Sequence, residues 1–393
     1  MNGIKTNIGS SLNRVAIVTH VFATGPAQEL EEYLKEKVDF LLFIGHPFSY
    51  APDTRSFFNI YNGGIVEKKT AFRWKLPEVL IYFKDVLYTL CWTIKCPKTF
   101  DLYIGADPLN AFSGIILKTI GKVKRVVFYT IDYVPKRFNS RVLNWIYHKI
   151  DKFCAEHSDY VWNLSERMIV ARKKYGVKMT NNQMVVPVGV RLERIKRLDI
   201  GQINRNHLVY MGHLRKNQGL QLLIDSLPVV IAKNPNIKLI IIGTGELEQY
   251  LKNKVRELNL MVHVEFKGYI ENHKDVEDIL STCGVGLSLY EPHQDSFTWY
   301  TDPGKPKQYL ACGLPVIITK VPWIAEKIER MPMGIAINYD QEELVKAITK
   351  LMTDNEFYKK CRENAIGYVS GLSWDKIFNE ALIKSAELTM API

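Results

Sequence analysis

The stretch GLSLYEPHQDSFTWYTDPGKPKQYLACGLPVII, residues 286–318, decides the fold. It begins inside an apolar strand, crosses a polar loop rich in aromatic residues, and enters a helix near Pro306 before a second apolar strand, 315–318. A strand, a loop and a helix N-terminus in this order form an anion site, because the first N–H groups of the helix have no partner inside it. Lys305 adds a positive charge, and Gly304 lets the backbone approach a ligand closely. The stretch therefore predicts a diphosphate-binding element.

The size and composition of the chain predict an ordinary globular protein of two domains. The chain has 393 residues, which is too long for a single core. Its six cysteines are scattered without a Cys-x-x-Cys pair, which argues against a zinc site and indicates a reducing compartment. The net charge of +11 favours an anionic partner, and nucleic acid, an anionic membrane and phosphorylated substrates all qualify.

The hydrophobic pattern predicts no signal sequence and no membrane span. The N-terminus has no apolar core before Val15. The most apolar run, 79–94, contains Lys84 and Asp85 and is shorter than a bilayer requires. We therefore expect a soluble cytoplasmic chain.

Strands and helices alternate along the sequence, which predicts an α/β protein with doubly wound parallel sheets. The first series runs over residues 1–190 and the second over 207–370, followed by a final helical segment, 371–393. The polar and charged residues 191–206 are the best position for an interdomain boundary.

Three residues of the first domain follow predicted strands, at the sheet edge where such folds bind ligands. Gly25 lies at the first strand-to-helix turn, and a simple turn is as good an interpretation as a ligand contact. Asp107 and Asp132 each follow an apolar strand, so both are expected to face the ligand. The alternative for each aspartate is a helix cap or a turn residue.

Residues 67–98 combine seven basic residues with six aromatic ones. Basic and aromatic residues along a helix suggest a segment that lies on an anionic membrane, whereas the alternative is a core helix with a solvated basic face. A second basic segment, 136–152, favours the membrane.

Strands of the second domain end near glycines: Gly212, Gly243, Gly268 and, after a longer loop, Gly304. A glycine at a strand end permits close approach of a ligand to the backbone. Four of them on one domain predict a nucleotide-sized ligand along the sheet edge.

Several motifs of the second domain resemble glycosyltransferase family 4. They are YMGHLRKNQG (210–219), IIGTGE (241–246), FKGY (266–269) and PGKPKQYLACGLPV (303–316). The resemblance implies the GT-B fold, in which two Rossmann-like, doubly wound domains face a central cleft. Residues 373–375, Ser-Trp-Asp, resemble the start of the C-terminal helix that crosses back to the N-terminal, acceptor-binding domain.

The resemblance implies transfer of a sugar from a UDP- or GDP-sugar to a glycan or lipid-linked acceptor. It implies retention of anomeric configuration, and it implies no catalytic metal and no cofactor. Cell-surface polysaccharide or glycolipid assembly is the expected setting. With the basic segments, this predicts a cytoplasmic protein that is peripheral on the inner face of the plasma membrane.

The strand ends and the motif positions together give the candidate residues and their roles. The catalytic candidates are Asp107, Arg215 and Lys305, and the acceptor-binding candidates are Asp132 and Arg137. The donor-binding candidates are Gly25, Gly212, His213, Lys216, Gly243, Gly245, Lys267, Gly268, Tyr269, Tyr300, Asp302, Gly304 and Gln308.

Five positions depart from the family pattern. Gln308 replaces the usual glutamate, and His213 and Gln218 replace two cations. Arg215 and Lys216 can supply this charge from shifted positions, and the alternative is that both face solvent. Ala106 stands where a histidine is frequent, with Asp107 beside it. The family's glutamate position, which falls near Tyr300, holds no glutamate, and Glu291 and Asp295 are the nearby candidates.

Two other hypotheses stay open, the first because of these departures and the second because of the charge. The first is a non-catalytic relative that binds a nucleotide sugar. The second is a nucleic-acid-binding protein, suggested by the charge; it ranks last because the chain shows no nucleic-acid motif.

Overall fold

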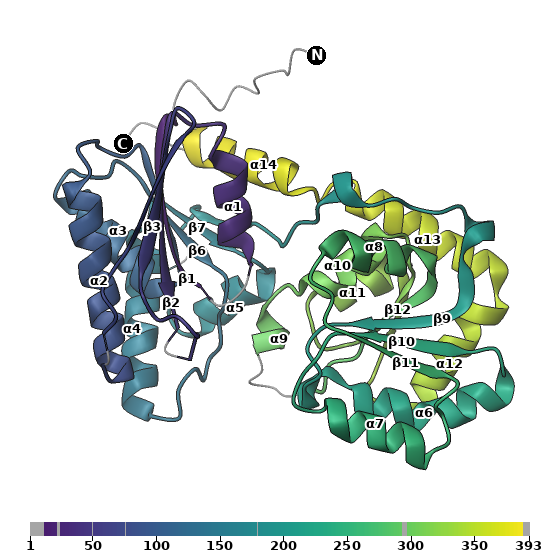
Figure 1. The fold of residues 1–393 in the computed structure, drawn as a ribbon. Helices are drawn as coiled ribbons and strands as arrows, with labels where there is room; N and C mark the ends of the chain where they lie inside the picture. Colours follow the sequence, from purple (N-terminus) through teal and green to yellow (C-terminus); the bar gives the residue numbers. More distant parts are fainter. Residues whose placement is uncertain are drawn as a thin grey trace. The chain divides into compact units, whose positions relative to one another are not determined.

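The computed structural model describes residues 12–387, except 22–23, 49, 75, 179 and 293–296. The chain forms two compact units (Figure 1). Unit 1 contains Met1–Pro187 together with Trp374–Ile393, and unit 2 contains Val188–Ser373. Each unit is an α/β layer structure around its own sheet, which is mostly parallel in unit 1 and fully parallel in unit 2, as the alternating pattern of the sequence predicts.

Unit 1 is built on a sheet with the strand order β4-β3-β2-β1-β5-β6-β7-β8. Strands β2, β1, β5, β6, β7 and β8 are parallel, whereas β3 and β4 are antiparallel additions at one edge. The central strand β1 is buried from Val15 to Val18, as expected for a parallel strand covered on both faces. The strands are β1 (Arg14–Val21), β2 (Phe40–Pro47), β3 (Phe57–Asn62), β4 (Ile65–Thr70), β5 (Leu102–Ala106), β6 (Val126–Thr130), β7 (Tyr160–Asn163) and β8 (Gln183–Val185).

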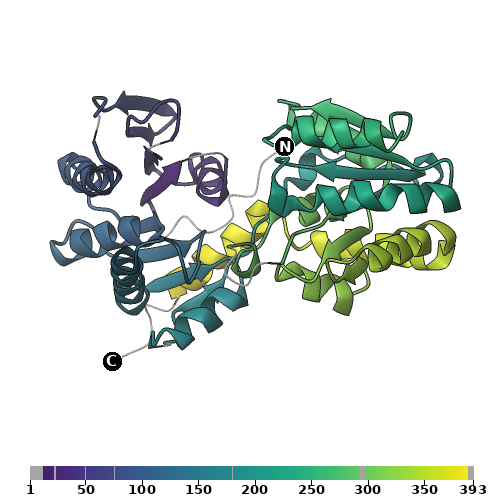
Figure 2. The same cartoon turned by 90° about the horizontal axis from the view of Figure 1, so that it is seen from below.

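Helices cover both faces of this sheet (Figure 2). Helices α2, α3 and α4 lie on one face, and α1 and α14 lie on the other. The helices of unit 1 are α1 (Pro26–Leu34), α2 (Glu78–Lys95), α3 (Pro108–Thr119), α4 (Arg141–His157), α5 (Glu166–Lys174) and α14 (Trp374–Glu387).

The interpretation of residues 67–98 as one helical segment is wrong at its beginning. Residues 67–70 lie on strand β4, and the helix α2 begins only at Glu78. A two-residue turn, Gly63-Gly64, joins β3 to β4, and both glycines have positive φ angles of 57° and 88°. The dipeptide is a hairpin signal that the sequence carries, because such turns require positive φ at both central residues.

Helix α14 follows unit 2 in the sequence but packs against unit 1. The ring of Phe378 lies 5.6 Å from that of Tyr33 on α1. The indole N–H of Trp162 on β7 donates to Ser385 Oγ at 3.1 Å. Phe378 and Leu382 are fully buried, so α14 completes the core on this face of the sheet.

Unit 2 is built on a fully parallel sheet with the order β11-β10-β9-β12-β13-β14. Its strands are β9 (Asn204–Met211), β10 (Lys238–Ile242), β11 (Val264–Gly268), β12 (Cys283–Ser288), β13 (Val316–Thr319) and β14 (Gly334–Ile337). Its helices are α6 (Leu220–Lys233), α7 (Glu248–Glu257), α8 (His273–Thr282), α9 (Phe297–Tyr300), α10 (Gly304–Ala311), α11 (Ile324–Arg330), α12 (Gln341–Thr353) and α13 (Asn355–Val369).

Successive residues along the strands of unit 2 alternate between two cores. One core contains side chains of α6, α7 and α12, and the other contains side chains of α8, α10 and α11. Residues 191–206, expected to contain the interdomain boundary, belong to unit 2, which begins at Val188. Arg197 Nε donates to the carbonyl of Ala311 at 2.8 Å, and Arg194 pairs with Glu277 at 2.9 Å.

Each sheet reverses its strand order at one point. In unit 1 this point lies between β1 and β5, and in unit 2 it lies between β9 and β12. At such a point the loops leave the carboxyl ends of neighbouring strands in opposite directions, which opens a crevice for a ligand. Among the residues that the structure describes, no helix is both long and apolar enough to cross a membrane.

Candidate functional site

Three glycines form the carboxyl edge of neighbouring strands in unit 2. Gly212 follows β9, Gly243 follows β10, and Gly268 ends β11. Their φ angles are 139°, 127° and 67°, which L side chains rarely adopt. A Cβ atom on Gly243 would lie 2.0 Å from the carbonyl oxygen of Gly212. The edge can therefore consist only of bare backbone, as a closely bound ligand requires.

Lys305 lies at this glycine edge, on the first turn of α10. A Cβ atom on Gly212 would lie 2.9 Å from Lys305 Cδ. The amine contacts Gln218 Oε1 and lies 3.4 Å from the hydroxyl of Tyr210. It also lies 4.9 Å and 5.0 Å from the ring centroids of Tyr210 and Tyr290. The predicted lysine and the predicted glycine edge thus meet beside the switch point of the sheet.

The charge of Lys305 has no ionic partner in the described part of the chain. The groups around its amine are neutral. Burial lowers the pKa of Lys305 to about 7. In contrast, the amine of Lys307 forms a buried ion pair with Asp302 and donates to the carbonyl of Val188 at 2.6 Å. Lys305 is therefore the lysine of α10 that remains available to an anion.

Gln308 lies on the same helix and is held by a carboxylate. Its Nε2 donates to Glu277 Oε1 at 2.8 Å, and Arg194 binds the same oxygen at 2.9 Å. Burial raises the pKa of Glu277, whereas the charge of Arg194 acts in the opposite direction. The bond to Glu277 uses the amide nitrogen of Gln308, so the amide oxygen is left as the acceptor that a ligand hydroxyl can reach. Sequence reasoning missed Glu277, because α8 is distant in the sequence.

Three other donor-binding candidates lie close to α10 in the sequence, and the structure shows the contacts of one of them and the places of the other two. Asp302 is buried and accepts a hydrogen bond from the backbone N–H of Val188 at 2.9 Å, in addition to its pair with Lys307. Gly304 is the first residue of α10, and Tyr300 is the last residue of α9. The structure thus gives Asp302 a role in holding α10 in place.

The remaining candidates of unit 2 lie on loops at the same edge. His213, Arg215 and Lys216 are exposed in the loop after β9, whereas Gln218 turns inward to Lys305. Gly245 packs against the backbone of Leu214, where a Cβ atom would lie 2.5 Å from the carbonyl oxygen. Two more candidates lie on β11 and after it: Lys267 pairs with Glu265, and Tyr269 is 74% exposed. Glu291 follows β12, and Asp295 lies outside the described residues. The roles assigned to these residues stay predictions.

Asp107 has an unusual conformation at the carboxyl end of β5 in unit 1. Its φ angle is 75° and its ψ angle 158°, and although it precedes α3 its side chain does not cap that helix. Its Oδ1 is buried without a hydrogen-bond partner. A non-glycine residue in such a conformation costs on the order of 1–3 kcal/mol and is typical of functional sites. The geometry does not support the cap alternative for Asp107.

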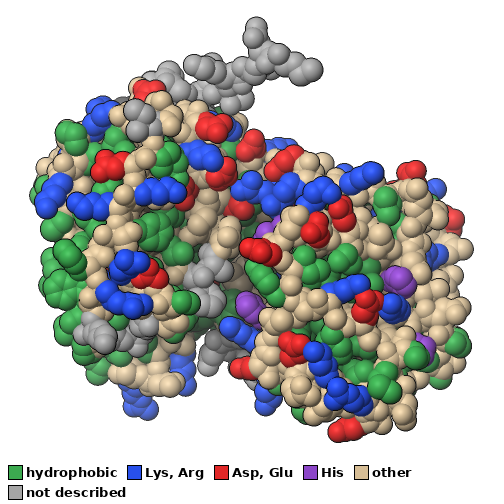
Figure 3. All heavy atoms as spheres, viewed as in Figure 1, with side chains coloured by type: hydrophobic (Ala, Val, Ile, Leu, Met, Phe, Trp, Pro, Cys, Tyr) green, Lys and Arg blue, Asp and Glu red, His purple; other side chains and the backbone are tan. Residues whose placement is uncertain are grey.

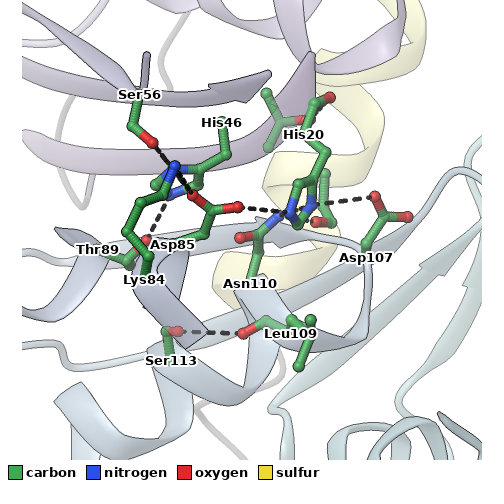
Figure 4. Close-up of polar contacts among 12 residues, drawn as sticks. His20, His46, Ser56, Lys84, Asp85, Thr89, Asp107, Leu109, Asn110 and Ser113 are labelled. Carbon is green, nitrogen blue, oxygen red and sulfur yellow. Dashed lines mark hydrogen bonds and ion pairs between the residues drawn. The ribbon is translucent and has the colours of Figure 1, made fainter. Parts of the chain in front are cut away.

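His20 and Asp85 lie beside Asp107 and were missed by sequence reasoning (Figure 4). His20 is near the end of β1, and its Nδ1 lies 3.8 Å from Asp107 Oδ2. Its Nε2 lies 3.6 Å from Asp85 Oδ2 on α2. The side chains of His20 and Asp85 are 5% and 3% exposed. His20 is the second-last residue of β1, and Asp107 directly follows β5, so the position of His20 before the first turn was the signal in the sequence.

Asp85 is held on its far side by other polar groups (Figure 4). Its Oδ1 accepts a hydrogen bond from Ser56 at 3.1 Å and lies 3.3 Å from His46 Nδ1 and 3.0 Å from Lys84 Nζ. Burial raises the pKa of Asp85, but the contacts with His20 and His46 outweigh burial and hold the pKa below its usual range. Asp85 is therefore a buried carboxylate anion with one oxygen directed at His20.

Asp132 and Arg137 follow β6, and both interact electrostatically with Asp107. Burial, together with the charge of Asp107, raises the pKa of Asp132 to about 6, against the opposing charge of Arg137. The Arg137 guanidinium lies 5.6 Å from the ring centroid of Tyr147. Gly25 precedes α1, and its N–H donates to Gln28 Oε1 at 2.9 Å, which favours the turn alternative.

The chain is similar to known families and structures. Residues 200–367 match the family described as glycosyl transferases group 1. Over 160 residues the chain is 27% identical to a chitobiosyldiphosphodolichol beta-mannosyltransferase of Debaryomyces hansenii, a match that covers 39% of this chain and 33% of the relative. The chain spans between a third and a half of the length of the first curated relatives that it matches.

Solved structures resemble the chain over nearly its whole length. The sucrose-phosphate synthase of Thermosynechococcus elongatus superposes with a TM-score of 0.69 at 15% identity, covering 96% of this chain and 99% of that one. The Anabaena protein HepE, in complex with UDP and glucose, superposes with a TM-score of 0.66 at 14% identity, covering 96% and 100%. These structures confirm the predicted fold, and the match of residues 200–367 confirms the predicted resemblance to glycosyltransferases.

Proposed function

We propose that this chain, which carries a glycosyl transferases group 1 domain over residues 200–367, transfers a sugar from a UDP- or GDP-sugar to a glycan or lipid-linked acceptor. The names of the curated relatives are those of transferases, and they do not favour a non-catalytic binding module. Cell-surface polysaccharide or glycolipid assembly is the setting that we propose. Retention of configuration is the outcome that the resemblance implies.

The position of Lys305 carries the proposal. Its amine lies among neutral groups at a bare glycine edge, beside the N-terminus of α10. A diphosphate bound there would meet a lysine charge and the first N–H groups of the helix, which are the groups that stabilise a leaving diphosphate. In this proposal these groups meet the developing charge without a metal ion, and the amide oxygen of Gln308 accepts a hydrogen bond from a nucleoside hydroxyl.

A thermal-shift screen with UDP, GDP and ADP tests the donor class. We expect one of them to raise the melting midpoint of the chain, because a ligand that binds only the folded state stabilises it. Sugar transfer is then measured with the matching UDP- or GDP-sugars, in buffer with and without a chelator. The variant Lys305→Ala should weaken nucleotide binding at least tenfold, whereas Lys359→Ala on the exposed face of α13 should not change it. If no nucleoside diphosphate shifted the midpoint and no sugar were transferred, the proposal would be wrong.

We propose further that unit 1 rests on an anionic membrane at the cytoplasmic side. A stripe of apolar side chains follows one face of α2 and is largely exposed: Val79, Leu80, Phe83, Leu87 and Ile94. Val142, Trp145 and Ile146 are exposed on α4. In the view of Figure 3, hydrophobic side chains with Lys and Arg among them gather over α2. Exposed apolar stripes flanked by basic residues are typical of helices that lie in a membrane interface.

Flotation with liposomes tests this surface. The wild-type chain should float with vesicles that contain phosphatidylserine and less with phosphatidylcholine alone, because basic residues add attraction to anionic lipid. Phe83→Asp should abolish flotation. Val262→Asp is the matched control, because Val262 is 82% exposed on unit 2 and far from α2 in the sequence. Equal flotation of both variants would contradict the proposed surface.

A further inference from the structure

A cavity lies in unit 1 where the hairpin of β3 and β4 meets the end of α2. Its volume is about 410 Å³. Small-molecule sites usually have volumes of roughly 300–1,000 Å³. The walls come from β2, β3 and β4, from the last turn of α2 and from residues 96–98 after that helix. Residues from both ends of the basic and aromatic stretch 67–98 thus meet at one cavity.

The floor of the cavity is apolar. Leu42 on β2 pairs with Ile60 on β3, and alternate side chains of both strands point to the same face of the sheet. Phe40, Leu42 and Phe58 belong to a core cluster, and Ile60 and Trp92 pack against it. The ring centroid of Trp92 lies 5.1 Å from that of Phe58. Because Ile60 and Trp92 are only partly buried, this core is open to solvent at the cavity.

The rim of the cavity is positively charged. Lys69 comes from β4, Lys95 from α2 and Lys98 from the turn after it. Among the described residues, the lining holds a single carboxylate, that of Glu67, and none of the three lysines has an ion-pair partner. Lys98 Nζ lies 4.6 Å from the ring centroid of Phe40, which places this charge at the border of the apolar floor. Amines without a carboxylate partner attract an anion.

The cavity is separate from the candidate site and from the exposed stripe of α2. Phe40 is the first residue of β2, and residues 96–98 precede β5, so the cavity lies toward the amino ends of the parallel strands. Asp107 follows the carboxyl end of β5, at the opposite edge of the sheet. Trp92 follows Phe83 by about two and a half helical turns, so the two side chains leave α2 on opposite sides.

We propose that this cavity binds one anionic amphiphile, with its apolar chain on the floor and its carboxylate or phosphate among Lys69, Lys95 and Lys98. An inorganic anion would not need the aromatic floor, and a neutral lipid would not need three lysines. Burial of the chain drives binding, and the charge sets its direction. A fatty acid and a phospholipid share this chemistry. The proposal is independent of sugar transfer, because the residues of the cavity belong to unit 1 and none is assigned to the donor or the acceptor.

Titration calorimetry of the full chain with sodium decanoate, kept below the concentration of micelle formation, tests the site. We expect saturable binding of one decanoate per chain. Butyrate keeps the carboxylate but shortens the chain, and decyltrimethylammonium keeps the chain but reverses the charge. Each should bind at least tenfold more weakly, since each lacks one of the two features that the cavity recognises. Absence of decanoate binding, or equal binding of either comparison compound, would overturn the proposal.

Two neighbouring lysines of β4 provide a matched pair of variants. Lys69 lines the cavity, whereas Lys68 points to the other face of the sheet, where its charge acts on the carboxyl group of Glu31 on α1. Both side chains are exposed, so both variants should fold as the wild type does, which the melting midpoint verifies. Lys69→Glu should weaken decanoate binding at least tenfold, and Lys68→Glu should stay within about threefold, because salt screens the more distant charge. Equal affinities of the two variants would place the ligand elsewhere and overturn the proposal.

Competition identifies the source of the anionic group. Dihexanoyl phosphatidic acid and decanoate should displace each other, because both chains occupy the same floor, and the tighter of the two indicates a phospholipid or a fatty acid. Failure of displacement would contradict a shared site. Phe83→Asp should keep the wild-type affinity for decanoate, because Phe83 lies on the other side of α2 from the cavity. Loss of decanoate binding in Phe83→Asp would assign the ligand to the exposed stripe and overturn the proposed cavity, whether or not the chain transfers sugars.

Discussion

Lys305 and Lys307, both in the first turn of α10, differ in the charge of the groups that surround their amines. Lys307 is paired with the buried carboxylate of Asp302, whereas the amine of Lys305 contacts neutral oxygens and aromatic rings. Desolvation without an ionic partner disfavours the charged amine, which lowers its pKa to about 7. Lys305 is therefore a group whose charge responds both to pH near neutrality and to a bound anion.

The affinity for a nucleotide sugar should fall as the pH rises through about 7. The protonated amine of Lys305 pairs with the diphosphate and the neutral amine does not, so the dissociation constant should increase about tenfold from pH 6 to pH 8. Titration calorimetry with UDP-glucose or GDP-mannose measures this, since their diphosphates keep a constant charge in this range. Lys305→Arg should bind independently of pH, because arginine stays protonated. A pH-independent wild type would contradict the prediction.

Asp132 should make the stability of the chain depend on pH. Its folded pKa is raised to about 6, above the ordinary value, so the cost of its ionisation is absent below about pH 4 and complete above about pH 6. Asp132→Asn should therefore stabilise the chain by about 1–3 kcal/mol at pH 7.5 and hardly at all at pH 4. Urea denaturation at both pH values measures this. Asp39→Asn, at an exposed position, should show no such difference between the two pH values.

The residues of the candidate site were predictable to different degrees. Lys305 and its glycines follow from the order of strand, loop and helix, because each lies in the same local motif. To predict His20, one must know that β1 lies beside β5 and that α2 places Asp85 next to the His20 ring. Glu277 was equally hidden, because its partner Gln308 is 31 residues away. A local pattern carries no information on such contacts.

At the scale of elements, one arginine ties α5 to α4 and to two strands. Arg172 is fully buried and forms a two-bond pair with Asp151 on α4, at 2.8 Å and 2.6 Å. It also donates to Asn163 on β7 and Thr130 on β6. Because every bond crosses between elements, Arg172 fixes the position of α5 against the edge of the sheet.

Arg172→Met should destabilise the chain by about 3–5 kcal/mol, because it leaves Asp151 buried without its cation. Urea denaturation followed by circular dichroism measures the loss. Lys173→Met makes the same chemical change at the exposed neighbouring position and should stay within about 0.5 kcal/mol of the wild type. A loss below 1 kcal/mol for Arg172→Met would contradict the role assigned to this pair.

The prediction of elements succeeded where periodicity was strong and failed where it was not. The buried strands β1, β2, β5 and β6 are continuous apolar runs, which a parallel sheet requires. Strand β4 is nearly all exposed and carries Lys68 and Lys69, so its composition resembled that of a basic helix. Only the turn at Gly63-Gly64 distinguishes a hairpin there.

At the scale of the whole chain, the last helix belongs to the first unit. Phe378 of α14 is fully buried against Tyr33, and Ser385 accepts from Trp162. The alternating pattern was sufficient to predict two domains with parallel sheets, because the apolar residues of each strand and helix indicate which of its faces are buried. The packing partner of a single amphipathic helix such as α14 cannot be predicted in the same way, since its apolar face fits any complementary surface.

Phe378→Ala should destabilise unit 1 by about 3–5 kcal/mol, the usual cost of removing a buried phenylalanine ring. Differential scanning calorimetry should show a lower transition for unit 1, while the binding of nucleoside diphosphate to unit 2 is retained. Lys384→Ala, on the exposed face of α14, is the control and should leave the calorimetric trace unchanged. Loss of nucleotide binding together with the unit 1 transition would contradict the independence of the two units.

The return of α14 to unit 1 also sets an order of events during synthesis. Unit 2 is one uninterrupted segment, whereas unit 1 waits for a helix that the ribosome makes about 200 residues after Pro187. Since synthesis proceeds at roughly 5–20 residues per second, the surface of the nascent unit 1 that Phe378 later covers stays uncovered for roughly 10–40 s. During that interval an apolar surface beside Tyr33 and Trp162 is exposed to the cell. Chaperones that bind nascent chains would thus meet unit 1 rather than unit 2.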